Sequence, residues 1–129
     1  MHEIKKQIIS TDRAPGAIGP YSQAAKVGKF LYTSGQIPLD LQGNLITGDV
    51  QAQTKQVMEN LRGVLEAAGT SFENIIKTTV FIKNMDDFAK INEIYAQYFP
   101  ENPPARSCVE VARLPRDVQV EVEVIALIP

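Results

Sequence analysis

The chain has 129 residues, of which 44% are hydrophobic and 22% charged, a balance typical of one globular domain and not of a disordered chain. Its 13 basic and 15 acidic residues are scattered, and with a net charge of −2 the sequence shows no basic cluster of the kind that binds nucleic acid. A single cysteine, Cys108, excludes an intrachain disulfide, and no apolar run reaches the length of a membrane span. We therefore expect one cytoplasmic domain, 1–129, that has no contact with a membrane.

The first third of the chain predicts short strands separated by loops. Residues 6–10 and 23–35 are rich in β-branched and aromatic residues, and a central glycine in the second segment suits a tight turn. Two prolines and two glycines in 13–22 exclude regular structure there, so we expect an ordered loop that presents Tyr21. A second loop is expected at 36–48.

Two amphipathic helices are expected in the middle of the chain, at 49–69 and 86–99. In the first, apolar residues recur on one helix face, Asp49 can cap the start, and a glycine can end it. Between the helices, β-branched residues predict a strand at 74–83. The apolar stripe of the second helix consists of Phe88, Ile91, Tyr95 and Phe99, and we expect Phe88 and Ile91 to lie in the core.

The last third predicts two strands, at 106–111 and 118–125, joined as a hairpin. Valines alternate with polar residues in both strands, which indicates one dry face and one largely polar face. If Val111 pairs with Val118, antiparallel registry places both valine sets on the same face. The opposite face then collects a guanidinium, a thiol and three carboxylates, from Arg106, Cys108, Glu110, Glu121 and Glu123.

This order of elements predicts an α+β fold in which two helices pack on the valine-rich face of one mixed sheet. The other face of the sheet is left uncovered. Because Ile125 and Leu127 make that face partly apolar, we expect a second subunit to cover it.

The sequence contains few residues or motifs that could bind a metal or a nucleotide cofactor. Zinc needs several Cys, His or carboxylate ligands at suitable spacings, and the only histidine is His2, close to the first residue. Neither GxxxxGKS/T nor GxGxxG occurs among the eight glycines. We therefore expect no metal and no nucleotide.

Four stretches carry a family resemblance: IGPYSQ at 18–23, TSGQIP at 33–38, KTTVFIKNMDDF at 77–88 and PARSCVEVARLPRDVQVEVEVIA at 104–126. On these residues the chain closely resembles the Rid family of reactive intermediate deaminases, also called YjgF, over nearly its whole length. The resemblance implies a chorismate-mutase-like fold and a homotrimer with active sites between subunits. It also implies hydrolysis of 2-imino acids to 2-oxo acids and ammonia without a metal or organic cofactor.

Arg106 is the first candidate for substrate binding. A 2-imino acid carries a carboxylate, which a guanidinium can hold with two parallel hydrogen bonds. The match to the family's substrate-binding arginine, within PARSC, is direct. The alternative is a cross-strand ion pair with Glu123 or Glu110, a kind of surface contact worth about 0–1 kcal/mol.

Glu121 and Cys108 match the family positions that hold the attacking water. The resemblance implies that Cys108 acts through its backbone carbonyl, and a catalytic thiol would in any case need a nearby base. The alternatives are a small packed side chain for Cys108 and an ordinary polar strand residue for Glu121.

Four further residues complete the expected site. The Tyr21 hydroxyl can orient the imine or the water, and Ser34 and Gly35 end a strand where a ligand can approach main-chain N–H groups. Asn92 matches a polar family position on the second helix. The alternatives are core packing for Tyr21, a plain turn at Ser34 and Gly35, and a solvated helix residue for Asn92.

These observations predict a cofactor-free, homotrimeric deaminase of 2-iminopropanoate or 2-iminobutanoate, the unstable products of pyridoxal-phosphate-dependent dehydratases. An imine is already electrophilic, so fixing the substrate and a water molecule accounts for catalysis. Two other interpretations are a non-catalytic protein that binds a 2-oxo acid or another small carboxylate, and an endoribonuclease. The net charge of −2 and the lack of a usable histidine argue against the endoribonuclease.

Overall fold

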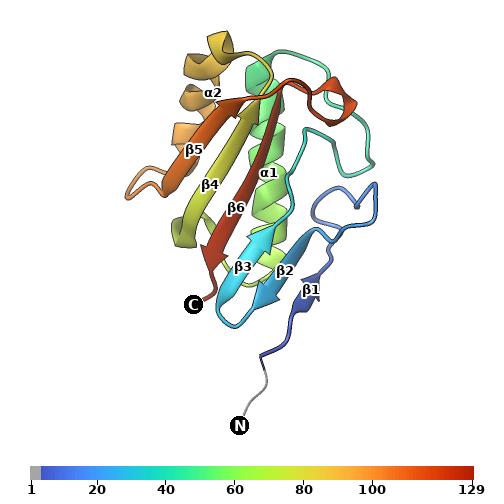
Figure 1. Ribbon diagram of the computed structural model, residues 1–129, viewed down its shortest axis with the longest axis vertical. Coiled ribbons are helices and arrows are strands. Elements are labelled where there is room, and N and C mark those ends of the chain that lie inside the picture. The colour runs from blue at the N-terminus through green and yellow to red at the C-terminus, as the bar shows by residue number, and fades with distance from the viewer. Residues whose placement is uncertain (1–3) are drawn as a thin grey trace.

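Six strands form one mixed sheet, and two helices cover one of its faces (Figure 1). The computed structural model describes residues 4–129. The strands are β1 (Gln7–Ile9), β2 (Ala24–Val27), β3 (Phe30–Thr33), β4 (Ile75–Ile82), β5 (Ala105–Glu110) and β6 (Val120–Leu127), and the helices are α1 (Val50–Ala67) and α2 (Phe88–Tyr95). Across the sheet the strands run in the order β1-β2-β3-β6-β4-β5. The expected α+β fold, a mixed sheet with both helices on one face, is confirmed.

Helix α1 begins and ends where the sequence predicts. The Asp49 side chain accepts a hydrogen bond of 2.8 Å from the Ala52 amide, which satisfies one of the free N–H groups of the first turn. Gly69 follows the helix with φ = +85°, a conformation that favours glycine. The apolar face of α1 is fully buried at Val57, Leu61, Val64 and Leu65.

The second helical segment extends beyond α2, because 3-10 turns at Met85–Asp87 and Ala96–Tyr98 flank it. Helical turns therefore run from Met85 to Tyr98, close to the helix expected at 86–99, although only Phe88–Tyr95 is α-helical. Its stripe is buried at Ile91, Tyr95 and Phe99, whereas Phe88 is 36% exposed. The prediction that Phe88 lies in the core was wrong, because its ring lies under the guanidinium of Arg106, with 5.4 Å between the guanidinium carbon and the ring centroid.

Strand β6 lies between β3 and β4 and has two distinct faces. Val120, Val122, Val124 and Ala126 are at most 2% exposed and pack toward the helices. Residues at the alternate positions, Glu121, Glu123, Ile125 and Leu127, therefore point to the open face. None of the helices within residues 4–129 is both long and apolar enough to cross a membrane.

The predicted hairpin between the last two strands was wrong, because β4 lies between them. Strand β5 pairs parallel with β4, so Val80 lies beside Cys108, and β6 pairs antiparallel with β4 on the other side. The connection crosses the end of β4: the Val111 amide donates to the Ile82 carbonyl, and the Lys83 amide donates to the Gln119 carbonyl. Each strand therefore takes its register from β4.

This topology changes which side chains share a face. Thr78 is fully buried under the helices and lies beside Arg106 in the β4–β5 register, so Arg106 and Cys108 point to the helix side. Val109 points away and is 42% exposed. The expectation that Val109 joins the valines of the core was therefore wrong. The expected common face was also wrong for Glu121 and Glu123, whereas Glu110 does lie on the same side as Arg106 and Cys108.

The open face of the sheet carries a ladder of exposed apolar side chains. Phe30 pairs with Leu127, and Tyr32 pairs with Ile125, across the β3–β6 register. Phe30, Tyr32 and Leu127 are each between 42% and 47% exposed. The expectation that Ile125 and Leu127 lie on this face is confirmed, and its cover by a second subunit stays a prediction.

At Gly63, helix α1 packs closely against the N-terminal loop. A Cβ at this position would overlap the Arg13 carbonyl oxygen, a backbone atom that cannot rotate away. Alanine normally stabilises a helix interior by about 0.5–1 kcal/mol relative to glycine, but overpacking costs about 1–3 kcal/mol. We expect Gly63→Ala to lower the free energy of unfolding, measured by chemical denaturation. The control is Gly16→Ala, where nothing lies within 4 Å of the added Cβ; equal stability of the two variants would contradict the close packing.

Candidate functional site

A cavity of about 320 Å³ opens where β3 ends and β6 begins. It is lined by Ile18, Tyr21, Ser34, Gly35, Ile37, Pro115 and Glu121. Four of the residues expected in the site, Tyr21, Ser34, Gly35 and Glu121, therefore lie together. The apolar walls at Ile18, Ile37 and Pro115 were not expected from the sequence, although IGPYSQ, TSGQIP and ARLPRD each contain one of them.

A buried amide fixes the loop that carries Tyr21. Gln23 is only 5% exposed, and its side-chain oxygen accepts a hydrogen bond of 2.7 Å from the Thr11 amide. Its side-chain nitrogen donates to the carbonyls of Thr11, Ala14 and Pro15, at 3.0, 3.3 and 2.8 Å. One glutamine thus supplies hydrogen bonds that regular secondary structure would otherwise supply.

Tyr21 and Ser34 leave specific hydrogen-bonding groups free for a ligand. The Tyr21 hydroxyl accepts a hydrogen bond of 3.2 Å from the Ile18 amide, so its own proton remains free to donate. The Ser34 hydroxyl donates to the Ser22 carbonyl at 2.5 Å, which leaves its oxygen lone pairs free to accept. Tyr21 is 46% exposed, so the core-packing alternative for it was wrong.

The second loop, 36–48, is held by amides of helix α1 in the same way. The Asn60 side chain is 1% exposed and donates to the carbonyls of Ile37 and Leu39, at 3.2 and 2.9 Å. The Gln53 side chain donates to the Ile46 carbonyl at 3.2 Å. These contacts fix the Ile37 wall of the cavity relative to the helix.

The carboxylate of Glu121 lies directly against the backbone of Gly35. A Cβ on Gly35 would overlap Oε2 of Glu121, so only glycine leaves room for this arrangement. Burial raises the pKa of Glu121, and the negative charge of Glu123 raises it further. A raised pKa makes the ionised carboxylate a better proton acceptor near neutral pH than an ordinary glutamate.

Arg106 lies on the other face of the sheet, in a cluster of neutral groups from α2. Its Nη1 donates to Oδ1 of Asn92 at 2.7 Å. Its guanidinium carbon lies 4.9 Å from the ring centroid of Tyr95 and 5.4 Å from that of Phe88. These three residues follow one another at i, i+4 and i+7, on one helix face. Counting Phe88 and Tyr95 only as core residues concealed this role.

The ion-pair alternative for Arg106 was wrong. Glu123 points to the opposite face of the sheet, and the Glu110 side chain instead accepts a hydrogen bond of 2.8 Å from the Met85 amide. Within residues 4–129, Arg106 has no carboxylate partner. Its positive charge therefore stays uncompensated, held by an amide oxygen and two aromatic faces. Asn92 acts as the hydrogen-bond acceptor for Arg106, which excludes the solvated alternative for it.

Cys108 has the environment of a packed thiol. It is half-buried against the main core, and burial raises the pKa of its thiol, an effect that the charge of Arg106 partly offsets. A raised pKa disfavours the thiolate that a nucleophile requires. The side chain is best explained by packing, as the alternative for this residue anticipated.

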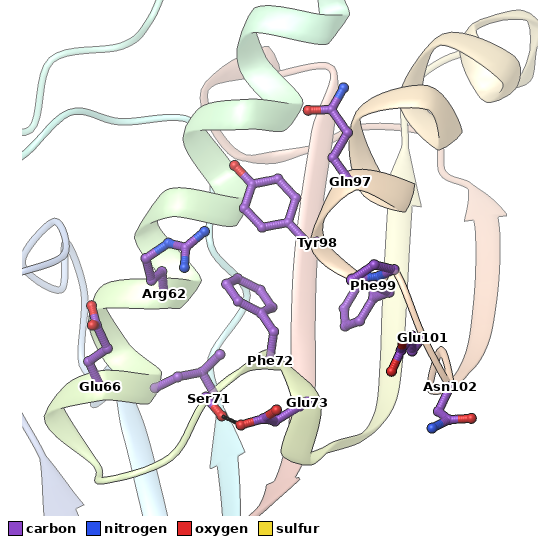
Figure 2. A pocket seen from close by; sticks show the side chains of 12 residues that line it. Arg62, Glu66, Ser71, Phe72, Glu73, Gln97, Tyr98, Phe99, Glu101 and Asn102 are labelled. Atoms are coloured by element: carbon purple, nitrogen blue, oxygen red, sulfur yellow. Dashed lines mark hydrogen bonds between the residues drawn. The ribbon is translucent and has the colours of Figure 1, made fainter.

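A second hollow, of about 490 Å³, lies between α1 and residues 97–102 (Figure 2). Here Arg62 lies over the rings of Phe72 and Tyr98, 5.2 and 5.5 Å from their centroids, and pairs with Glu59 at 3.2 Å. The Tyr98 hydroxyl donates to Glu59 at 2.6 Å. Arg62 and Glu59 of α1 thus pair with each other, and both contact Tyr98. These contacts join α1 to the helical turn that follows α2.

No group of three or more His, Cys, Asp or Glu side chains that could hold a metal ion occurs in the described part of the chain. The cavity and the Arg106 cluster contain mainly neutral donors, acceptors and rings, with one carboxylate and one guanidinium. Such a set suits a small polar ligand with an anionic group better than it suits a metal.

Comparison with known proteins identifies the family. The family model described as Endoribonuclease L-PSP matches residues 11–128. The chain belongs to this family. It is the Rid, or YjgF, family that the sequence motifs indicate, so that identification is confirmed.

Relatives match this chain over nearly their full lengths. A RutC family protein of Pyrococcus horikoshii is 56% identical over 122 residues, which cover 94% of this chain and 97% of the relative. Escherichia coli TdcF, named "Putative reactive intermediate deaminase", is 53% identical over 95% of this chain and 97% of its own. The solved structure of E. coli TdcF with bound serine has a TM-score of 0.90 and 52% identity over 94% of this chain and 98% of that one.

The half-buried carboxyl group of Glu121 predicts a pH-dependent stability. Because its pKa is raised in the folded state, protonated Glu121 favours folding at low pH, and this contribution is lost as pH rises through the raised pKa. We expect Glu121→Gln to gain stability relative to the wild type as pH rises through a range that begins at about 4, where glutamate in an unfolded chain ionises. Thermal midpoints measured across this range check the prediction, with Glu101→Gln as a control at an exposed position. A difference between Glu121→Gln and wild type that shrinks as pH rises would contradict it.

Proposed function

We propose that the protein is a cytoplasmic, cofactor-free deaminase that hydrolyses 2-imino acids such as 2-iminopropanoate and 2-iminobutanoate. The observation that carries the proposal is the unpaired guanidinium of Arg106, oriented by neutral groups alone. A charge that the fold leaves uncompensated favours an anion, and every 2-imino acid carries a carboxylate. The serine in the TdcF structure, an amino acid that also carries a carboxylate, supports this ligand class.

The proposed reaction uses the groups on both faces of the sheet. Arg106 binds the substrate carboxylate, and Glu121 accepts a proton from a water molecule that attacks the imine carbon. A C–O bond forms while the imine nitrogen takes up a proton, which the Tyr21 hydroxyl can supply. Protonated Glu121 then gives its proton to the amine nitrogen of the resulting carbinolamine, and the carbinolamine hydroxyl returns a proton to Tyr21. The C–N bond breaks as the C=O bond forms, so that ammonia and a 2-oxo acid leave and both side chains regain their starting forms. Water is the only co-reactant.

Arg106 and Glu121 point to opposite faces of the sheet in one chain, so a site that contains both needs a second copy. We propose that Arg106 of one subunit faces the Tyr21–Glu121 cavity of its neighbour in a cyclic homotrimer. The exposed ladder of Phe30, Tyr32 and Leu127 supports burial of the open face in such an assembly.

The activity itself is testable with an imine generated in solution. A threonine or serine dehydratase releases the imine, and the rate of 2-oxo acid formation is compared with and without the protein. We expect acceleration by the wild type, and a loss of at least several hundredfold in kcat/KM for Arg106→Ala, because a bidentate charge-assisted contact is removed. Arg106→Lys should rescue little, since lysine lacks the planar fork.

The matched control is Arg62→Ala. Arg62 also lies over two aromatic rings but is already paired with Glu59, so its loss should leave deamination unchanged. An unchanged imine hydrolysis rate with wild-type protein contradicts the enzyme. If the wild type then still binds a 2-oxo acid through Arg106, the protein is a carboxylate-binding regulator; cleavage of added RNA would instead support the endoribonuclease.

Mixed oligomers test whether the site is shared between chains. Arg106→Ala and Glu121→Ala should each be inactive alone. When equal amounts are unfolded and refolded together, about one quarter of the sites in a cyclic trimer combine an intact Arg106 with an intact Glu121. We expect activity near that fraction of wild type, and light scattering should report three chains of 14.2 kDa per particle. No recovery on mixing, with the trimer formed, would contradict a shared site.

A further inference from the structure

A hydrogen bond in the core lies directly behind the Arg106 cluster. Tyr95, whose ring contacts the guanidinium, is 7% exposed, and its hydroxyl lies 2.8 Å from Oγ1 of Thr78. Thr78 is fully buried. Neither residue lines the Tyr21–Glu121 cavity, and the Tyr95 ring contacts the proposed substrate-binding residue.

The register of the sheet places this hydrogen bond next to Arg106. Thr78 of β4 lies beside Arg106 of β5, on the same face of the sheet. The hydroxyl pair therefore ties the ring of Tyr95, which belongs to α2, to the strand residue next to Arg106. Without it, the ring would be held by packing alone, including its contact with Phe99 at 4.8 Å between centroids.

The chemistry of the cluster also depends on Tyr95 remaining neutral. Burial raises the pKa of Tyr95, although the hydrogen bond between Tyr95 and Thr78 and the charge of Arg106 oppose this. A neutral ring offers its negative face to the guanidinium without neutralising it, whereas a tyrosinate would form an ion pair and compete with an anion.

We propose that Thr78 and Tyr95 are positioning residues, which orient the Arg106 guanidinium for the substrate carboxylate. The inference rests on the proposed function, in which Arg106 binds that carboxylate. Asn92 engages Nη1, so the edge formed by Nε and Nη2 is left to form two parallel hydrogen bonds with a carboxylate. Such a pair requires the guanidinium plane to be fixed, and the anchored Tyr95 ring fixes it from one side.

A structural role for the same hydrogen bond makes a different prediction. If Thr78 and Tyr95 only hold α2 against the sheet, activity should follow stability in every variant. If they orient Arg106, activity should depend on the anchored ring even where stability is restored. The two hydroxyls can be removed singly or together, which separates these roles.

The experiment compares Thr78→Val, Tyr95→Phe and the double variant. Each single change leaves one buried hydroxyl without its partner, so the thermal midpoint should fall, whereas the double variant leaves none and should recover. All three should show about a tenfold lower kcat/KM, mainly through a higher KM, because carboxylate binding is weakened. Thr78→Ser keeps the hydroxyl and should restore activity. The matched control is Thr54→Val, which removes a buried hydroxyl that donates within α1 to Val50.

A readout independent of turnover separates this inference from the proposed function. With pyruvate bound, the Nε–H signal of Arg106 in NMR spectra should exchange slowly in the wild type and faster in the double variant, and pyruvate should bind the double variant more weakly. If kcat/KM returns to wild type together with the thermal midpoint, the pair is only structural. If the wild type does not deaminate, the proposed function fails, while the Nε–H exchange still supports or contradicts the positioning role.

Discussion

The alternation of side chains along a sheet covered on one face is the constraint on which this structure depends. From Thr78 onward in β4, and along β6, every second residue is committed to the core under α1 and α2, which leaves the remaining positions for chemistry. Strand β5 at the edge is less buried, so its helix-side residue Arg106 reaches the rim of the sheet. Glu121, on β6, lies on the other side. The sheet itself therefore separates the guanidinium of Arg106 from the carboxyl group of Glu121.

Neutral hydrogen bonds, rather than ion pairs, hold the functional groups in place. Gln23, Gln53 and Asn60 fix the irregular loops around the cavity, and Asn92 fixes Arg106. The ion pairs given by the structure, Arg62–Glu59 and Lys83–Asp117, lie outside both groups of site residues. Salt and modest pH changes weaken ion pairs more than amide contacts, so this scaffold keeps its geometry while Glu121 titrates.

Local sequence patterns predicted the elements well, because caps, periodicity and turn residues act over a few positions. Asp49 and Gly69 bound α1 as expected, and 13–22 forms the irregular loop that presents Tyr21. Such local patterns do not determine which strands lie next to each other in the sheet. The valines of 106–111 and 118–125 show which residues share a face within each strand, but not that β4 inserts between them. That adjacency is set by contacts distant in sequence, and it decided where Arg106 points.

In the candidate site, too, some features follow from local sequence and others only from which strands are neighbours. Tyr21, Ser34, Gly35 and Glu121 meet because β3 and β6 are neighbours, as the family motifs implied. The role of Phe88 was missed because an aromatic residue in an apolar stripe resembles a core residue. Only the position of β5 beside α2 shows that this ring lies under a guanidinium instead.

The exposed ladder of Phe30, Tyr32 and Leu127 has a consequence for a single copy of the chain, outside the proposed trimer. A newly folded single copy presents these side chains on a sheet whose outer strands, β1 and β5, each have one unpaired edge. In the proposed homotrimer this surface is covered by neighbouring subunits, whereas a lone copy leaves it open to unfolded or half-folded chains. We therefore expect aggregation to compete with assembly for as long as the chain remains a single copy.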